Sequence, residues 1–306
     1  MKKIVIAGGS GFLGRALIDF YLPKGYEIVV LSRKAKETGN DMLRYVAWNA
    51  KTLDIWLTEL EGIEALINLT GKSVDCRYNP KNKAEILNSR VQSTEVLGEA
   101  IKACAVPPKF WINSSTATIY EHSLEKEMTE STGIIGNDFS MNVAKSWEEA
   151  FHNTKTPRTQ KIALRTSIVL GKNGGAFLPL KNLTKAGLGG TQGNGNQKVS
   201  WIHEHDFCRA IHFLITKNKA GIFNVTAPNP LPNKTFMQTL RRILKIPFGL
   251  PQPKWLLKLG ARIIKTEAEL ILKSRFVIPE KLLTAGFQFN YPTAEMAIQE
   301  IIQRKN

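Results

Sequence analysis

The stretch Lys3–Gly14, KIVIAGGSGFLG, decides the fold class of this 306-residue chain. Its short apolar run is typical of a buried strand. The glycines that follow have both GxGxxG spacing (Gly9, Gly11, Gly14) and GxxGxxG spacing (Gly8, Gly11, Gly14). Between a strand and a helix, glycines permit a tight turn, close approach of a pyrophosphate and free N–H groups at a positive helix end. The stretch therefore predicts a dinucleotide-binding βαβ unit.

Beyond this unit, short β-branched runs alternate with segments of helical periodicity over two thirds of the chain. Strands are expected at Lys3–Ala7, Glu27–Ser32, Ala65–Thr70, Lys109–Ser114, Lys161–Val169 and Ile222–Thr226. Helices are expected at about Gly11–Leu22, Ile86–Ala105 and Ser140–Asn153. The alternation predicts an α/β protein with a doubly wound parallel sheet, the NAD(P)-binding Rossmann fold.

The pattern changes after Ala227, where Pro228, Pro230 and Pro232 are typical of a linker. We therefore expect a Rossmann domain over residues 1–227 and a small, mostly helical lobe over residues 228–306. A glycine-rich stretch within about 172–199 is expected to form a mobile insert on the substrate side.

The chain is strongly basic, with 42 Lys and Arg against 26 Asp and Glu and a formal net charge of +16. Residues 231–281 contain eleven Lys and Arg against three Glu, which is half of this excess. A basic surface suits nucleic acid, anionic lipid or a phosphorylated substrate. No nucleic-acid recognition motif is present, so a nucleic-acid partner is not expected.

Other features of the composition favour a cytoplasmic protein. The three cysteines are far apart and form no CxxC pair. No signal-peptide pattern and no apolar run of about 20 residues is present, so no transmembrane segment is expected.

The segment Pro253–Lys265 predicts an amphipathic basic helix. Four cations recur at helical spacing along one side, namely Lys254, Lys258, Arg262 and Lys265. The opposite side carries an apolar stripe of Trp255, Leu256, Leu259 and Ile263. We expect the stripe to pack on the Rossmann domain with the charges in water. The alternative is peripheral association with an anionic membrane surface.

The end of the second expected strand bears on the choice of cofactor. In NAD sites an acidic residue about twenty positions after the glycines binds the ribose hydroxyls. Here Ser32, Arg33 and Lys34 follow the strand and no acid is present. A guanidinium can bind a 2′-phosphate with a charge-assisted, two-pronged contact. NADP(H) is therefore favoured over NAD.

Together these residues resemble the extended and atypical short-chain dehydrogenase/reductase superfamily, and within it one epimerase-family subgroup. The further markers are Asn68–Gly71 (NLTG), Ser114–Tyr120 (SSTATIY), Gly171–Gly175 (GKNGG), Trp201–Asp206 (WIHEHD), Asn224–Pro230 (NVTAPNP) and Ala285–Phe287 (AGF). This subgroup carries the labels nucleoside-diphosphate-sugar epimerase and SulA-like cell division inhibitor, and has a small C-terminal domain of unknown role.

The resemblance implies which residues line the cofactor cleft: Gly8, Ser10, Gly11, Phe12, Leu13, Gly14, Ser32, Arg33, Leu69, Thr70, Gly71, Ser114 and Lys145. It also implies a small-molecule substrate of the nucleotide-sugar kind and a monomeric or homodimeric protein.

Hydride-transferring members of the superfamily combine Ser or Thr with a Tyr and a Lys four residues apart on one helix. The resemblance places Thr116 at the hydroxyl position and Lys145 at the lysine position, but the tyrosine position holds Met141. A thioether cannot transfer a catalytic proton. Tyr120 could supply the missing hydroxyl.

Two further explanations are open. Another acid could act, namely His203, His205, Glu121 or His122, or the protein could bind NADP(H) without turnover as a sensor or regulatory protein. If Tyr120 or another acid transfers the proton, the chain is expected to be an NADP-dependent oxidoreductase or epimerase. His203 and His205 would share a strand face, but no further ligand cluster accompanies them, so no metal is expected.

Overall fold

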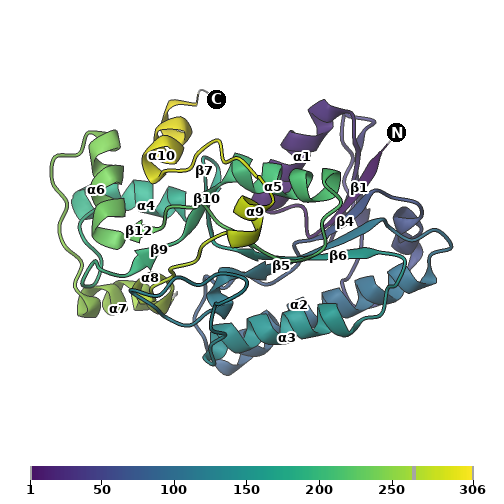
Figure 1. Ribbon diagram of the computed structural model, residues 1–306, viewed down its shortest axis with the longest axis horizontal. Coiled ribbons are helices and arrows are strands. Elements are labelled where there is room, and N and C mark those ends of the chain that lie inside the picture. The colour runs from purple at the N-terminus through teal and green to yellow at the C-terminus, as the bar shows by residue number, and fades with distance from the viewer. Residues whose placement is uncertain (1, 264–266, 305–306) are drawn as a thin grey trace.

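The computed structural model describes residues 2–263 and 267–304, and its centre is a seven-stranded parallel sheet (Figure 1). The strands lie in the order β11-β6-β5-β4-β1-β2-β3. Their bounds are β1 Lys3–Ala7, β2 Glu27–Ser32, β3 Leu43–Ala47, β4 Ala65–Asn68, β5 Phe110–Thr116, β6 Gln160–Thr166 and β11 Gly221–Val225. The strand order reverses between β1 and β4, which is the switch point where doubly wound sheets bind ligands.

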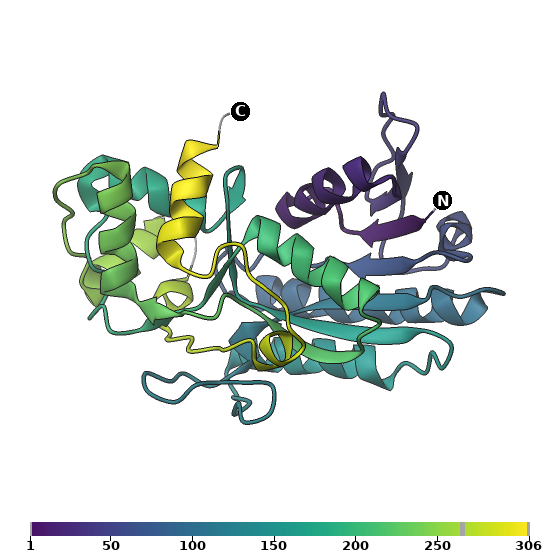
Figure 2. The same cartoon turned by 45° about the horizontal axis from the view of Figure 1, so that its top comes forward.

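Helices cover both faces of the sheet because its strands alternate apolar side chains on the two faces. Ile4 and Ile6 of β1 pack with α1 (Phe12–Tyr21) and α5 (Glu204–Thr216). Val5 and Ala7 pack on the other side, in a core that includes residues of α2 (Pro80–Ala103) and α3 (Phe139–Asn153). Figure 2 shows α1 and α5 on one side of the sheet and α2 and α3 on the other.

A second, smaller lobe lies beside the sheet, at the left in both views. Its elements are β7 Ile168–Gly171, β8 Gly174–Gly175, α4 Phe177–Leu183, the π-helical turn Thr184–Leu188, β9 Lys198–Val199, β10 Trp201–His203, β12 Leu231–Pro232, α6 Asn233–Leu244, α7 Lys254–Ile263, α8 Glu269–Leu272 and α10 Ala294–Gln303. The predicted fold class, a doubly wound sheet with a smaller helix-rich lobe, is confirmed, and the lobe also contains two small sheets.

The lobe core is built from both sides of residue 227. Phe177 and Trp201 pack there against Phe236, Met237 and Ile298. In the other direction, the chain leaves the lobe after α8 and returns to the sheet domain before it enters the lobe again at α10. In the sheet domain, α9 (Glu280–Thr284) packs against β11, and Leu282 and Phe287 join the core around α1 and α5. A division of the chain at residue 227 therefore does not separate the two cores.

Several element boundaries differ from those expected. Helix α2 begins at Pro80, six residues before the expected start, and the Asn79 side chain caps it by accepting a hydrogen bond from the Asn82 amide. The expected strand over 161–169 is divided at Ser167 between β6, in the central sheet, and β7, in the three-stranded sheet. Periodicity does not reveal that one extended run serves two sheets.

Candidate functional site

The glycine-rich turn after β1 has the geometry of a phosphate cradle. Gly8 has φ +73°, and a Cβ on it would lie 3.0 Å from the backbone of Thr70. A Cβ on Gly14 would lie 2.1 Å from the Gly9 carbonyl oxygen, so only glycine permits this approach of helix and turn. Among the described residues no side chain caps α1 at Gly11, and its first turn carries no acid. The N–H groups there are free to bind an anion.

The loop after β4 closes the other side of the cradle. The Thr70 amide donates to Asn68 Oδ1 at 3.0 Å, and Asn68 Nδ2 donates to Asn113 Oδ1 at 2.7 Å. The Thr70 hydroxyl is buried and has no hydrogen-bond partner among the described residues. An unpaired buried hydroxyl is costly unless a ligand or water satisfies it, so this atom fits a bound cofactor.

Arg90 of α2 supports the same loop. A Cβ on Gly71 would lie 3.0 Å from the Arg90 guanidinium carbon, and Arg90 Nη1 donates to the carbonyl oxygens of Lys72 and Ile86 at 3.0 and 2.9 Å. Burial lowers the pKa of Arg90 to about 10. Sequence reasoning missed this residue because no motif links it to Gly71, nineteen positions earlier.

The end of β2 places a cation beside the cradle. Ser32 is buried and its Oγ donates to the carbonyl oxygen of Lys34 at 2.6 Å, which turns the chain at the strand end. Arg33 is exposed at this turn. Since β2 neighbours β1, Arg33 lies at the same carboxyl edge of the sheet as Gly8.

Thr116 and Lys145 lie on neighbouring elements. Thr116 ends β5, and its Oγ1 accepts a hydrogen bond from the Thr118 amide at 3.1 Å. Lys145 Nζ donates to Asn137 Oδ1 at 3.0 Å. Helix α3 packs against β5 and against the turn that follows it, and Ser114 is half-buried on the same strand.

Position 141 is part of the packing at the start of α3. Met141 is 5% exposed, and its Sδ accepts from the Asp138 amide at 3.4 Å. A Cβ on Gly136 would lie 2.3 Å from the same sulfur. The thioether therefore fills space between helix and loop, and a tyrosine there would displace this loop.

Tyr120 lies in a buried polar network. Its side chain is fully buried, and its hydroxyl donates to Asn224 Oδ1 at 2.9 Å and accepts from Arg165 Nη1 at 2.8 Å. Arg165 forms two further bonds to the Glu148 carboxylate, at 2.7 and 2.8 Å, and Ser115 Oγ donates to Glu148 at 2.6 Å. Burial raises the pKa of the Tyr120 phenol although Arg165 opposes the shift. Both hydrogen-bonding functions of the hydroxyl are already used inside the protein.

The histidines considered as proton donors lie in different places. His203 is buried and its Nε2 lies 2.8 Å from Glu300 Oε2, while its Nδ1 accepts from the His205 amide. His122 Nδ1 accepts from the Ser274 amide at 2.7 Å. No group of three His, Cys, Asp or Glu in the described part of the chain is arranged to hold a metal.

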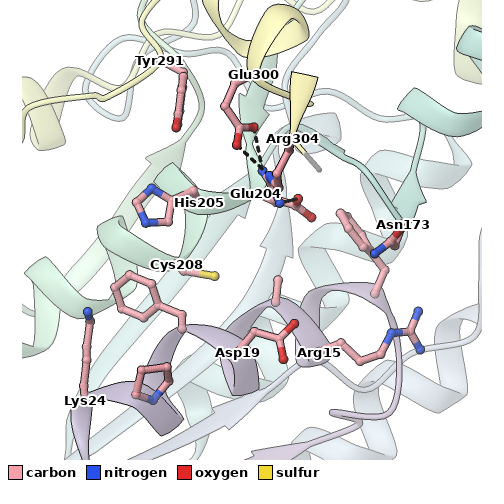
Figure 3. Close-up of a pocket in the computed structure, with 14 residues that line it drawn as sticks. Arg15, Asp19, Lys24, Asn173, Glu204, His205, Cys208, Tyr291, Glu300 and Arg304 are labelled. Carbon is pink, nitrogen blue, oxygen red and sulfur yellow. Dashed lines mark hydrogen bonds and ion pairs between the residues drawn. The ribbon is translucent and has the colours of Figure 1, made fainter. Parts of the chain in front are cut away.

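His205 faces a cavity of about 520 Å³ between α1, α5 and α10 (Figure 3). Phe12 of the glycine-rich turn lines this cavity, but Thr116, Tyr120 and Lys145 do not. At its upper rim Arg304 forms ion pairs with Glu204 and Glu300, both at distances of 2.6–2.7 Å. Lys172 donates to the carbonyl oxygen of Arg304, and a Cβ on Gly174 would lie 2.6 Å from the Phe12 ring. The cavity is thus adjacent to the cradle and separate from the predicted catalytic residues.

Fold, cradle and sequence together define a Rossmann-fold nucleotide-binding protein of the epimerase class. Residues 4–226 match the NAD dependent epimerase/dehydratase family, and residues 252–301 match a domain of unknown function, DUF1731. The chain belongs to the NAD dependent epimerase/dehydratase family.

Among its relatives is the epimerase family protein YfhF of Bacillus subtilis, which is 35% identical over 98% of both chains. The epimerase family protein SH2119 of Staphylococcus haemolyticus is 31% identical over 99% of both. The crystal structure of human epimerase family protein SDR39U1 with NADPH is similar with a TM-score of 0.88 and 28% identity, over 99% of this chain and 100% of that one. The nucleoside-diphosphate sugar epimerase of Corynebacterium glutamicum has a TM-score of 0.78 and 26% identity, over 98% of this chain and 58% of that one.

No described helix has the length and apolar character that crossing a bilayer requires.

Proposed function

We propose that the protein binds NADP(H) in the cradle between β1, β2 and β4. The observation that carries this proposal is the combination of the uncapped start of α1 with the unpaired, buried Thr70 hydroxyl on the opposite side of the turn. Gly8, Gly11 and Gly14 would allow the pyrophosphate to approach the backbone, with Ser10, Phe12 and Leu13 completing the turn. Leu69, Thr70 and Gly71 would line the opposite wall. The NADPH in the human SDR39U1 structure supports the choice of cofactor.

Arg33, with Ser32 beside it, would bind the 2′-phosphate. Titration of the protein with NADPH and NADH by calorimetry tests this assignment. Losing a charged hydrogen bond should weaken NADPH binding by about ten- to a hundred-fold in Arg33→Ala and leave NADH binding nearly unchanged. Lys217→Ala is a matched control, because Lys217 is an exposed cation that follows α5 and precedes β11, at the amino edge of the sheet. Equal affinity of the unaltered protein for NADH and NADPH would contradict the assignment.

We further propose an NADP-dependent oxidoreductase or epimerase that acts on a small, nucleotide-sugar-like substrate. When bound, the cofactor would supply hydride transfer at its nicotinamide. Thr116 would orient the reacting oxygen of the substrate, while Lys145 would hold the nicotinamide ribose beside Ser114. The name of the Corynebacterium glutamicum relative, a nucleoside-diphosphate sugar epimerase, supports this substrate class.

The missing tyrosine makes slow turnover the expected behaviour. Met141 cannot transfer a proton, and the engaged hydroxyl of Tyr120 is poorly placed to do so. Loss of a general acid typically costs about 10²–10⁴-fold in rate. The sequence analysis did not consider Tyr78 as a proton donor. Its hydroxyl is buried near Ser140 at the start of α3, and its ring contacts Phe139. Burial raises its pKa to about 12, so it would remain protonated at neutral pH.

The second candidate function is a non-catalytic NADP(H)-binding regulatory protein, and the buried Met141 at the tyrosine position favours it. NADPH consumption in the presence of nucleotide sugars separates the two functions. In the enzyme, Thr116→Ala and Lys145→Ala should each reduce turnover by at least tenfold, whereas Thr118→Ala should not. Tight NADPH binding without consumption would favour the regulatory function. Full activity in both Thr116→Ala and Lys145→Ala would place the chemistry elsewhere.

A further inference from the structure

Large apolar side chains gather on the outside of the lobe, on α7 and the loop that precedes it. Trp255 and Leu259 of α7 are 65% and 48% exposed, and Phe248 and Leu250 of the loop are also exposed. Figure 1 shows this loop and α7 at the end of the molecule that lies farthest from β1. Isolated exposed apolar residues are common, but several on one short segment indicate a binding surface.

The helix has a buried and an exposed apolar face. Leu257 and Ala261, four residues apart, are buried, so their side of α7 faces the protein. Trp255 and Leu259, also four apart, lie on the opposite side. The expectation that the apolar stripe packs on the Rossmann domain is therefore wrong for Trp255 and Leu259. The helix is held by a different pair of residues.

Three cations flank the exposed apolar face. Lys254, Lys258 and Arg262 are spaced by four residues, so they form a row along α7, and all three are exposed. Within residues 2–263 and 267–304, none of the three has an acidic partner within ion-pair distance. The fourth predicted cation, Lys265, lies outside the described residues. Two other cations of the lobe do have acidic partners: Lys273 contacts Asp138 and Glu269, and Arg242 contacts Glu295.

We propose that α7 and its preceding loop dock on the surface of an anionic lipid bilayer. Trp255, Phe248, Leu250 and Leu259 would enter the headgroup region, and Lys254, Lys258 and Arg262 would contact lipid phosphates. Tryptophan prefers this interface because its ring is apolar and its N–H is polar. A bilayer needs only a few inserted side chains and several cations, whereas a stable protein interface typically involves about 20–30 residues on each side.

The chain contains its own probe for this docking. Of its six tryptophans, five are buried and Trp255 is the exposed one. Transfer of Trp255 from water to a headgroup region should shift its fluorescence to shorter wavelength and protect it from aqueous iodide. The buried tryptophans should contribute little to either change.

The experiment mixes the full protein with vesicles of phosphatidylcholine alone or with added phosphatidylglycerol, and measures flotation and fluorescence. We expect binding and a blue shift with the anionic vesicles only, and loss of both at high salt. Each of Lys254→Gln and Lys258→Gln should weaken binding by about fivefold. Trp255→Phe should retain flotation and lose the blue shift, whereas Trp255→Ser combined with Leu259→Ser should lose flotation.

Ile55→Ser is the matched control, since Ile55 is 75% exposed on the sheet domain and belongs to no such surface; flotation should be unchanged. Circular dichroism and NADPH binding verify that each variant is folded. Failure of the unaltered protein to float with anionic vesicles would overturn the proposal. So would equal binding to neutral vesicles, or a blue shift that depends on protein concentration without lipid, which would identify a second copy of the chain as the occupant.

Discussion

Charged groups are treated oppositely in the two regions of this protein. In the sheet domain, Arg165 and Glu148 are buried and bonded to each other, to Tyr120 and to Ser115. On the lobe, the cations of α7 face solvent beside exposed apolar side chains. Charge that is buried must be paired in a fixed geometry, so it specifies the structure. Charge that is exposed and unpaired contributes little to folding and is available to a partner.

The largest effect is expected from Glu148→Gln. This change leaves the buried Arg165 guanidinium without its counter-charge, and breaking such a pair typically costs about 3–5 kcal/mol. The free energy of unfolding in urea should fall by about this amount. Glu149→Gln is the matched control, because Glu149 is the next residue of α3 and is exposed. Similar losses of stability for both variants would show that burial and pairing do not set Glu148 apart from an exposed carboxylate of the same helix.

A smaller loss is expected from Tyr120→Phe. Without the hydroxyl, Arg165 and Asn224 each lose a hydrogen bond, and an unsatisfied buried group costs about 1–3 kcal/mol. NADPH affinity and any turnover should change little at a temperature where the variant is folded. Abolished turnover with unchanged stability would instead place Tyr120 in the chemistry.

A pH dependence should arise from His203. Burial lowers its pKa in the folded protein although Glu300 favours the charged form. The neutral histidine is therefore preferred on folding, and the stability that it contributes is present above its unfolded pKa of about 6.5 and lost as the pH falls below that value. Urea unfolding at several pH values should show a decline below about pH 6.5. His203→Gln should make the decline shallower, and an unchanged pH profile in this variant would exclude His203 as a source.

The smallest effect is expected from Lys254→Gln combined with Lys258→Gln. Substitutions of exposed, unpaired side chains usually change stability by less than about 0.5 kcal/mol. Equilibrium unfolding should not distinguish this variant from the unaltered protein. A loss above 1 kcal/mol would mean that the row of cations supports the lobe itself.

The features that the sequence predicted well are local. The strand, the glycines and the helix over residues 3–21 follow from spacing and periodicity, and β1 and β2 have the expected bounds. The confirmed fold class follows from the repetition of such units. For the candidate site, the roles of Gly8, Arg33, Thr116 and Lys145 stay predictions.

The features that could not be predicted depend on contacts between distant segments. The phenol of Tyr120 bonds to Arg165 and Asn224, which are 45 and 104 positions away, and nothing in the local pattern reveals either partner. Periodicity placed Trp255 and Leu259 on one side of a helix. It could not show that Leu257 and Ala261 occupy the buried side of that helix.

The ion pairs of Arg304 have a mechanical consequence. The pair with Glu300 is local to α10, whereas the pair with Glu204 joins the last described turn of the chain to α5, and Lys172 donates to the Arg304 carbonyl oxygen. The turn that includes Lys172 and Gly174 rests on Phe12 of the cradle. The segment around Arg304 is thus connected, through these contacts, to Phe12 nearly three hundred positions earlier in the chain. Removal of Arg304 and the residues after it should therefore weaken the proposed NADP(H) binding, although Arg304 is not among the residues proposed to contact the cofactor.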